Sequence, residues 1–305
     1  MNRTSLSTRL GPPAVLGLPF LWLVVFFLAP FGIVLKISLS DPETAQPPYR
    51  PLLPWTPNWR DVQDFFAGLD FENFEALLGD SLYGQAALSS VRIAAISTAI
   101  LLGLGYPIAY AMARASRSWR PLLVGLVILP FWTSFLIRVY AWIAILKPEG
   151  LLNQALMVLG LVAAPLSILN TELAVYIGVV YAYLPFMILP LYASLERQDP
   201  TLIEAAQDLG SPPWKAFWTI TAPMSLPGIV AGSLLCFIPI VGEFVIPDLL
   251  GGSETLMIGR TLWSEFFSNR DWPLASAVAV VLLLILVVPI VLYREVEARR
   301  WEARA

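Results

Sequence analysis

Two carboxylates stand inside one of the most apolar stretches of this 305-residue chain. Glu243 and Asp248 lie in the segment VGEFVIPDLLGG, and Gly242 before the first acid leaves room for a ligand or a neighbouring helix. A carboxylate removed from water costs several kcal/mol unless it is paired, so an acid at such a position is a candidate functional group. The chemistry that it offers is the recognition of a cation.

Aromatic residues in neighbouring apolar runs could assist such recognition. Trp132, Tyr140 and Tyr183 can turn ring faces toward a cation, each contact contributing about 0.5–2 kcal/mol. Tyr140 is of particular interest because it lies two residues after Arg138. The alternative is that these rings pack the interior or anchor helices at the membrane interface.

Each acid also has a structural alternative. Arg138 is the obvious internal partner of Glu243, and a Glu243–Arg138 ion pair would hold helices together or gate a path instead of binding a cation. Asp248 lies just before two glycines, where helix capping or solvation competes with ligand contact. The sequence leaves these alternatives open.

Several kinds of chemistry are excluded by composition. The chain contains no histidine and a single cysteine, Cys236, so it cannot form an internal disulfide, a histidine-based zinc site or a catalytic triad. None of its lysines follows a glycine, so it has no phosphate-binding P-loop. We therefore expect no enzymatic activity and no bound metal or cofactor, and any nucleotide chemistry must belong to a partner.

The elements that position these residues are predicted to be membrane-spanning helices. Hydrophobic residues make up 57% of the chain and charged residues only 13%, which indicates an integral membrane protein. Runs of about 20 apolar residues can cross a bilayer as helices. We expect one all-α, polytopic domain over residues 1–305, with six spans near 15–39, 86–113, 121–146, 173–195, 226–250 and 275–293. The first is read as a retained span, because its apolar run is too long for a signal peptide and no small-residue cleavage site follows.

Lysine and arginine positions predict the orientation, because positive loops stay in the cytoplasm. With both termini inside, the inner segments hold Arg3, Arg9, Arg114, Arg117, Arg120, Arg197, Lys215, Arg294, Arg299, Arg300 and Arg304. The outer segments hold only Arg50, Arg60, Lys147, Arg260 and Arg270. Both ends are therefore expected in the cytoplasm.

The outer segment 40–85 changes character along its length. A proline-rich piece, DPETAQPPYRPLLPWTPNW, predicts an extended or turn-rich strap. The following DVQDFFAGLDFENFEALLGD predicts short amphipathic helices against the outer membrane face. The segment holds eight acids and two arginines, so it is either a solvated acidic surface or a region that attracts arriving cations.

The inner segment 196–225 contains the polar stretch TLIEAAQDLGSPPWKAFWTITAP. Asp199 can cap a helix that begins at Pro200 and ends at Gly210, and Ser211 can cap a second helix that begins at Pro212 and closes at Pro223. Helices that rest on anionic lipid are normally rich in lysine and arginine. From Glu196 to Pro223 there are four acids against two cations, so a protein surface is a better partner than lipid.

This segment resembles the signature of ATP-binding-cassette importer permeases that work with a periplasmic binding protein. That signature reads EAA, three residues, Gly, nine residues, Ile, one residue, Leu-Pro. The matching positions here are Glu204, Ala205, Ala206, Gly210, Ile220 and Pro223, and Ala222 replaces the leucine. The resemblance implies the type I importer fold and a loop, including Asp208, that docks in a groove of an ATPase.

Further segments resemble the polyamine branch of this family, most of all its putrescine (PotH) type. They are residues 35–40, 132–153, 170–192, 241–252 and 257–280, so the resemblance covers nearly the whole chain. It implies a bacterial inner-membrane subunit that imports putrescine, with spermidine or another cation as the alternative substrate.

The partners implied by the resemblance are all proteins apart from the lipid bilayer. They are a second, homologous PotI-like permease, two copies of a PotG-like ATPase that binds ATP and magnesium, and a PotF-like periplasmic polyamine-binding protein. No nucleic acid is expected. Two rival readings remain, an ion-coupled secondary transporter and a structural subunit without a substrate path.

Overall fold

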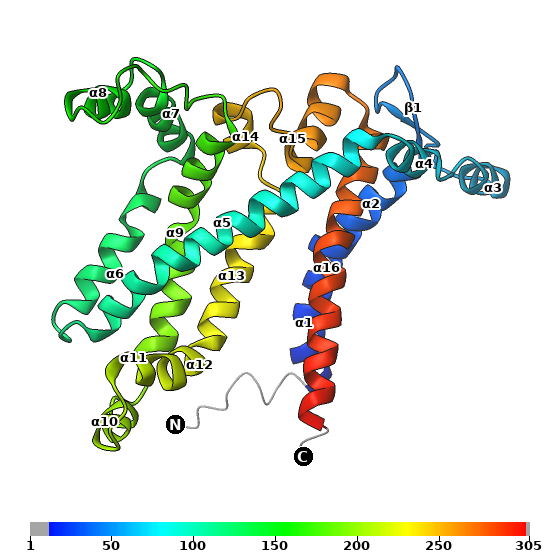
Figure 1. The fold of residues 1–305 in the computed structure, drawn as a ribbon. Helices are drawn as coiled ribbons and strands as arrows, with labels where there is room; N and C mark the ends of the chain where they lie inside the picture. The colour runs from blue at the N-terminus through cyan, green and yellow to red at the C-terminus, as the bar shows by residue number, and fades with distance from the viewer. Residues whose placement is uncertain (1–11, 303–305) are drawn as a thin grey trace, which may run out of the picture. The chain divides into compact units, whose positions relative to one another are not determined.

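The protein is described by a computed structural model that covers residues 12–302 and is built almost entirely of helices (Figure 1). The chain divides into two compact units. The first combines residues up to Gly84 with those from Leu262, and the second runs from Gln85 to Thr261. The long helix α5 (Ser81–Arg114) begins in the first unit and continues through the second.

The first unit pairs an N-terminal helix with a C-terminal one. Its elements are α1 (Pro12–Leu23), the π-helical turn η2 (Val24–Leu28), α2 (Ala29–Ser38), β1 (Asp41–Pro42), β2 (Tyr49–Arg50), α3 (Trp59–Ala67), α4 (Glu72–Gly79), the π-helical turn η5 (Ser264–Asn269) and α16 (Trp272–Glu302). Helices α2 and α16 lie side by side (Figure 1). Apolar side chains from Leu16 to Ile33 are exposed, as expected for a surface that faces lipid.

The proline-rich strap is tied to the end of α2. Strands β1 and β2 pair antiparallel, with Asp41 opposite Arg50. The Lys36 ammonium donates to the Pro51 carbonyl and lies 4.2 Å from the centroid of the Tyr49 ring. Asn73 of α4 donates to the backbone carbonyls of Ser38 and Ser40 at 3.2 and 2.8 Å. Lys36 also lies 5.4 Å from the ring centroid of Phe65 in α3. These contacts hold the predicted strap and the predicted amphipathic helices, α3 and α4, against the span that precedes them.

The second unit holds the remaining helices. They are α6 (Arg120–Ile128), the 3₁₀ turn η3 (Leu129–Trp132), α7 (Phe135–Leu146), α8 (Leu151–Val158), α9 (Glu172–Glu196), α10 (Thr201–Asp208), α11 (Pro213–Ala216), the π-helical turn η4 (Phe217–Thr221), α12 (Ala222–Met224), α13 (Leu226–Val241), α14 (Val245–Leu250) and α15 (Ile258–Trp263). The closest packing joins α9 to α13, which run side by side in Figure 1.

Small residues let α9 and α13 approach closely. A Cβ atom added at Gly228 would lie 2.5 Å from Ser194 Cβ and 2.9 Å from the Pro190 carbonyl oxygen. One added at Gly232, a turn further along α13, would lie 2.9 Å from the sulfur of Met187. This spacing of small residues is typical of membrane helices whose backbones touch.

Gly228→Leu is therefore expected to destabilise the protein. The added side chain must push α13 away from the α9 backbone, and overpacking of this kind costs about 1–3 kcal/mol. Thermal unfolding of the detergent-solubilised chain measures the effect. Gly103→Leu in α5 is the matched control, because a Cβ added there meets nothing within 4 Å. Equal unfolding temperatures for the two variants would contradict the close-packing argument.

Three predicted spans form single long helices. They are Leu16–Ser38, Ser81–Arg114 and Glu172–Glu196, and their bounds lie close to the predicted ones. Within residues 12–302, five helical stretches are long and apolar enough to cross a membrane if each of two bent pairs counts as one span. The predicted last span lies in α16, whose apolar part is Trp272–Val288. Arg3, Arg9 and Arg304, which contributed to the predicted orientation, lie outside the described residues.

Two predicted spans are interrupted in the structure and are not continuous helices. Over 121–146 the chain turns by 86° between Arg120–Trp132 and Phe135–Val158. Pro130 cannot donate a backbone hydrogen bond, and Thr133 is extended at φ −98° and ψ 149°. Over 226–250, α13 ends at Val241 and α14 starts at Val245. Pro247 cannot supply the bond that a continuous helix needs there.

Candidate functional site

A cleft of about 760 Å³ opens between helices of the second unit. Its wall is aromatic and aliphatic, with two charged side chains among the lining residues. The lining includes Phe131, Phe135 and Arg138 from the bent pair, Ala182, Tyr183 and Phe186 from α9, Leu234, Leu235, Ile238 and Pro239 from α13, and Gly242, Glu243, Phe244 and Val245 from the break before α14. Binding sites for small molecules are commonly of this size and this largely apolar character.

The break between α13 and α14 positions Glu243. The side chain is only 8% exposed, and one carboxylate oxygen accepts a hydrogen bond from the Tyr183 hydroxyl at 2.7 Å. The other oxygen accepts from the backbone N–H groups of Val245 and Ile246 at 3.0 and 3.4 Å, at the start of α14. All three donors are neutral, so they fix the carboxylate without cancelling its charge. Because a carboxylate offers about four lone-pair sites, capacity for a further donor remains.

Arg138 lies in the same cleft but does not neutralise Glu243. Among the described residues no ion pair joins the two side chains. The guanidinium instead lies 5.7 and 5.8 Å from the ring centroids of Phe131 and Phe135, a cation–π arrangement. Its Nε atom is buried without a hydrogen-bond partner in the described part of the chain. The cleft therefore contains one positive and one negative side chain that are not paired with each other.

The other predicted cation contacts lie elsewhere. Asp248 is half-exposed and forms an ion pair with Arg260, whose Nε lies 3.3 Å from its carboxylate. Arg260 also donates to the Gly252 carbonyl at 2.9 Å. Trp132 and Tyr140 are exposed and do not line the cleft. Of the predicted residues, the structure thus brings together Glu243, Tyr183 and Arg138.

The sequence did not single out the four phenylalanines of the cleft. Phe131, Phe135, Phe186 and Phe244 have no polar group that marks them, and apolar spans contain many such residues. The rings of Phe131, at the bend of the predicted span 121–146, and Phe186 of α9 pack edge to face at 5.1 Å. That bend could have been suspected from Pro130 followed by Thr133 and Ser134, which favour non-helical backbone.

The polar hairpin is a second candidate site. Its first helix, α10, begins at Thr201 with Pro200 at the N-cap, so the predicted cap Asp199 lies one residue before that position. The Thr201 N–H donates to the Asp199 carboxylate at 3.0 Å, and this backbone hydrogen bond together with one to the Thr201 side chain lowers the pKa of Asp199. Gly210 has a φ of +82°, and Ser211 N–H donates to the Ala206 carbonyl at 2.9 Å. This is a Schellman ending, which needs a left-handed residue that glycine adopts without strain.

The second half of the hairpin corrects two predictions. Helix α11 begins at Pro213 with Pro212 at its N-cap, so Ser211 is not the cap. Pro223 does not close the helix, which continues through the π-helical turn η4 and α12 to Met224. A π-helical turn holds an extra residue, so the proline ring is accommodated at the start of α12.

The hairpin presents a mixed acidic and apolar surface. Three large side chains stand out from it, with Leu209 exposed at 90%, Trp214 at 69% and Trp218 at 67%. The acids Glu204 and Asp208 are exposed beside them on α10. Of the other signature positions, Ala205, Gly210 and Pro223 are exposed and Ala206 and Ile220 are half-buried. An apolar surface of this kind with carboxylates around it is typical of a docking site for another protein.

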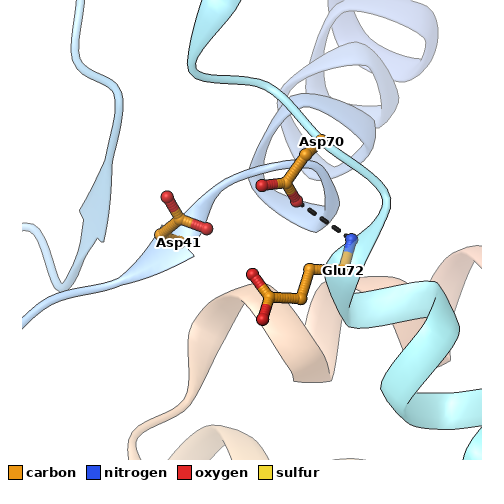
Figure 2. A group of neighbouring side chains, drawn as sticks. All are labelled: Asp41, Asp70 and Glu72. Atoms are coloured by element: carbon orange, nitrogen blue, oxygen red, sulfur yellow. Dashed lines mark hydrogen bonds between the residues drawn. The ribbon is translucent and has the colours of Figure 1, made fainter.

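A group of three exposed carboxylates stands in the first unit (Figure 2). Asp41, Asp70 and Glu72 place oxygen atoms within 4.8 Å of one another. Asp70 has a structural role, because it accepts a hydrogen bond at 2.9 Å from the Glu72 N–H at the start of α4. All three carboxylates are exposed and lie on the acidic surface of the outer segment, and both interpretations of that surface stay open.

Comparison with protein families places most of the chain in one of them. The family of the inner membrane components of binding-protein-dependent transport systems matches residues 105–301. The spermidine/putrescine transport system permease protein PotB of Haemophilus influenzae is 41% identical over 275 residues, which cover 90% of each chain. PotB of Escherichia coli is 42% identical over 222 residues, 73% of this chain and 80% of that protein.

A solved structure of low sequence identity has the same fold. It is a bacterial alginate ABC transporter in complex with an alginate pentasaccharide-bound periplasmic protein. One of its chains matches with a TM-score of 0.68 and 16% identity, and the match covers 97% of each chain.

Proposed function

Because the chain belongs to the family of binding-protein-dependent transport system inner membrane components, we propose that it is a pathway-forming subunit of an ATP-driven polyamine importer. It is a membrane permease and not an enzyme, and it resides in the inner membrane. The observation that carries the proposal is the exposed hairpin, whose signature residues stand on an accessible surface beside a membrane-spanning unit.

The proposed substrate class is the short polyamines. Support comes from the relatives named as spermidine/putrescine permeases and from the single buried acid in an aromatic cleft. The relatives reported above are PotB proteins, so they support the polyamine branch but not the putrescine (PotH) type. Putrescine as the preferred substrate stays a prediction, with spermidine as the alternative.

In the proposed pathway, Glu243 receives one ammonium group of the substrate. The carboxylate is held by neutral donors, so its charge is available to a cation. Tyr183 holds the acid in place, and the rings that line the cleft can face the methylene chain and the second ammonium group. We do not extend the proposal to Asp248, because Arg260 already neutralises it.

We propose that the hairpin α10–α12 is the docking element for an ATPase. Its apolar side chains and acids suit a groove with complementary charge, and Gly210 sets the turn between its helices. ATP and magnesium would bind on that partner. A homologous second permease of the PotI type, two ATPases of the PotG type and a PotF-like binding protein complete the proposed assembly. Six spans and cytoplasmic ends belong to the same proposal.

The proposal is tested by uptake in proteoliposomes. The chain is purified with its second permease and ATPase and is reconstituted into proteoliposomes. The binding protein is added on the periplasmic side, and uptake of labelled putrescine and spermidine is measured. We expect uptake only when ATP is present on the side of the membrane that carries the ATPase. Polyamine uptake by this chain alone, driven by a proton or sodium gradient, would instead identify an ion-coupled secondary transporter.

A further inference from the structure

The hairpin joins the span α13 at a sharp bend centred on Ser225. Helices Pro213–Met224 and Leu226–Val241 meet there at 62°. Ser225 is fully buried, and its N–H donates to the carbonyls of Thr221 and Ala222 at 3.0 and 3.2 Å. Only the short helix α12 separates the bend from the π-helical turn η4, so two departures from regular α-helix lie close to the point where the hairpin becomes a span. Such departures are frequent at functional hinges.

Tyr106 of α5 holds this bend through a hydrogen bond. The Ser225 hydroxyl donates its one proton to the Ala222 carbonyl at 2.9 Å. The Tyr106 hydroxyl lies 2.9 Å from the Ser225 oxygen, so Tyr106 is the donor in that bond. The chain Tyr106–Ser225–Ala222 therefore links α5 to the residue at the bend and to the helix on its hairpin side.

Phe217 forms a second link between the same elements. Its ring packs edge to face on Tyr106 and on Tyr110, with centroid distances of 5.6 and 5.7 Å. Tyr106 and Tyr110 are four residues apart and so share one face of α5, where Phe217 contacts both. Gln198, just after α9, donates to the Thr221 carbonyl at 3.0 Å at the other end of η4. The second half of the hairpin is thus held to α5 by the ring contacts of Phe217. It is held to the end of α9 by the hydrogen bond between the Gln198 side chain and the Thr221 carbonyl.

We propose that Tyr106 and Phe217 are positioning residues that make α5 follow the hairpin when the hairpin moves, with Ser225 as the hinge. This inference rests on the proposed docking of an ATPase at the hairpin. A force applied to the exposed tryptophans of the hairpin reaches the bend at Ser225 first. Without the two links the bend would absorb the displacement by opening or closing. With them, α5 is carried along, and the spans rearrange together.

The test uses the complete transporter in proteoliposomes. Tyr106→Phe removes the hydrogen bond to the hinge and keeps the ring, whereas Phe217→Leu removes the ring contacts. Both variants should co-purify with the ATPase and hydrolyse ATP within about twofold of the wild type, while polyamine taken up per ATP hydrolysed falls by about fivefold, as expected for the loss of one buried interaction. The matched control is Tyr110→Phe, which keeps its ring against Phe217 and should leave the ratio unchanged.

A double variant tests whether the hydrogen bond itself matters. Ser225→Ala alone should lower the uptake per ATP as Tyr106→Phe does, and combining the two should add no further loss, because both remove the same bond. An unchanged ratio in Tyr106→Phe and Phe217→Leu would overturn the inference. So would equal losses of hydrolysis and uptake, since these indicate poor docking or folding. Failure of the proposed function would look different, because the wild-type complex itself would show no ATP-dependent uptake.

Discussion

Glu204→Lys is expected to abolish ATP-dependent uptake while the protein still inserts into the membrane. Glu204 is exposed in the first turn of α10, where an acid is favoured by the helix dipole. The change places a second lysine on a surface whose acids are proposed to face a positively charged groove. Breaking one charge pair at an interface costs about 2–5 kcal/mol, so binding of the ATPase should weaken by at least about tenfold. Co-purification of the ATPase and uptake in proteoliposomes measure the two effects.

Two comparisons make this result specific. Glu204→Gln keeps the size of the side chain and removes only the charge, so its loss of ATPase binding should be intermediate. Thermal unfolding of the lysine variant should match the wild type within about 1 kcal/mol, because the site is exposed and makes no described contact that the fold depends on. A lysine variant that retains the full complement of ATPase and normal uptake would show that the hairpin is not the docking element.

The hairpin shows what local sequence rules can predict. Gly210 as the end of α10 follows from the chemistry of a few residues, and Gly210 has the left-handed backbone that this ending needs. The predicted cap Asp199 accepts a hydrogen bond from the Thr201 N–H, but Pro200 occupies the N-cap of α10. The second half was less predictable. Its path through Pro223 depends on the π-helical turn η4, which is supported by Phe217 against Tyr106 and Tyr110, more than a hundred residues earlier in the chain. Sequence rules for the end of a helix consider only neighbouring residues, so they cannot predict contacts between residues so far apart in the chain.

The cleft shows the same division between local and long-range information. An acid in an apolar run singles out Glu243 from the sequence alone, because its burial is costly. Its partner Tyr183 was one of several plausible aromatics, and only the packing of α9 against α13 selects it. The predicted pairing with Arg138 rested on opposite charge. In the structure Arg138 is held by Phe131 and Phe135, which the bend of 86° brings into position.

The break before α14 explains why a hydropathy profile predicts one span where the structure has two helices. Every residue from 226 to 250 except the two acids and the prolines suits a membrane helix, so hydropathy gives no sign of an end at Val241. The interruption turns the backbone N–H groups of Val245 and Ile246 toward Glu243. The break between α13 and α14 therefore holds the Glu243 carboxylate in place, as is common where helices are interrupted inside a transport path.

Glu243→Gln is expected to reduce polyamine uptake by about 10- to 100-fold, the loss that corresponds to one hydrogen bond to a charged group of about 1.5–3 kcal/mol. The amide keeps an oxygen for the backbone N–H groups of α14, and the Tyr183 hydroxyl can accept from its nitrogen, so the local fold should persist. What disappears is the charge that attracts an ammonium group. Uptake rates over a range of polyamine concentrations measure the effect, with ATPase binding unchanged.

Asp248→Asn is the matched control, because it removes a carboxylate from the same segment at a position that is paired with Arg260 and lies outside the cleft. Its uptake should fall far less than that of Glu243→Gln.

Arg138→Gln separates substrate binding by Glu243 from gating by an Arg138–Glu243 pair. If Arg138 closes the path by pairing with Glu243 at some stage of transport, the double variant Arg138→Gln/Glu243→Gln will take up polyamine no more slowly than Glu243→Gln alone. Unchanged uptake in Glu243→Gln together with failed assembly would instead assign Glu243 a structural role, since a path residue must alter transport in a complex that still forms.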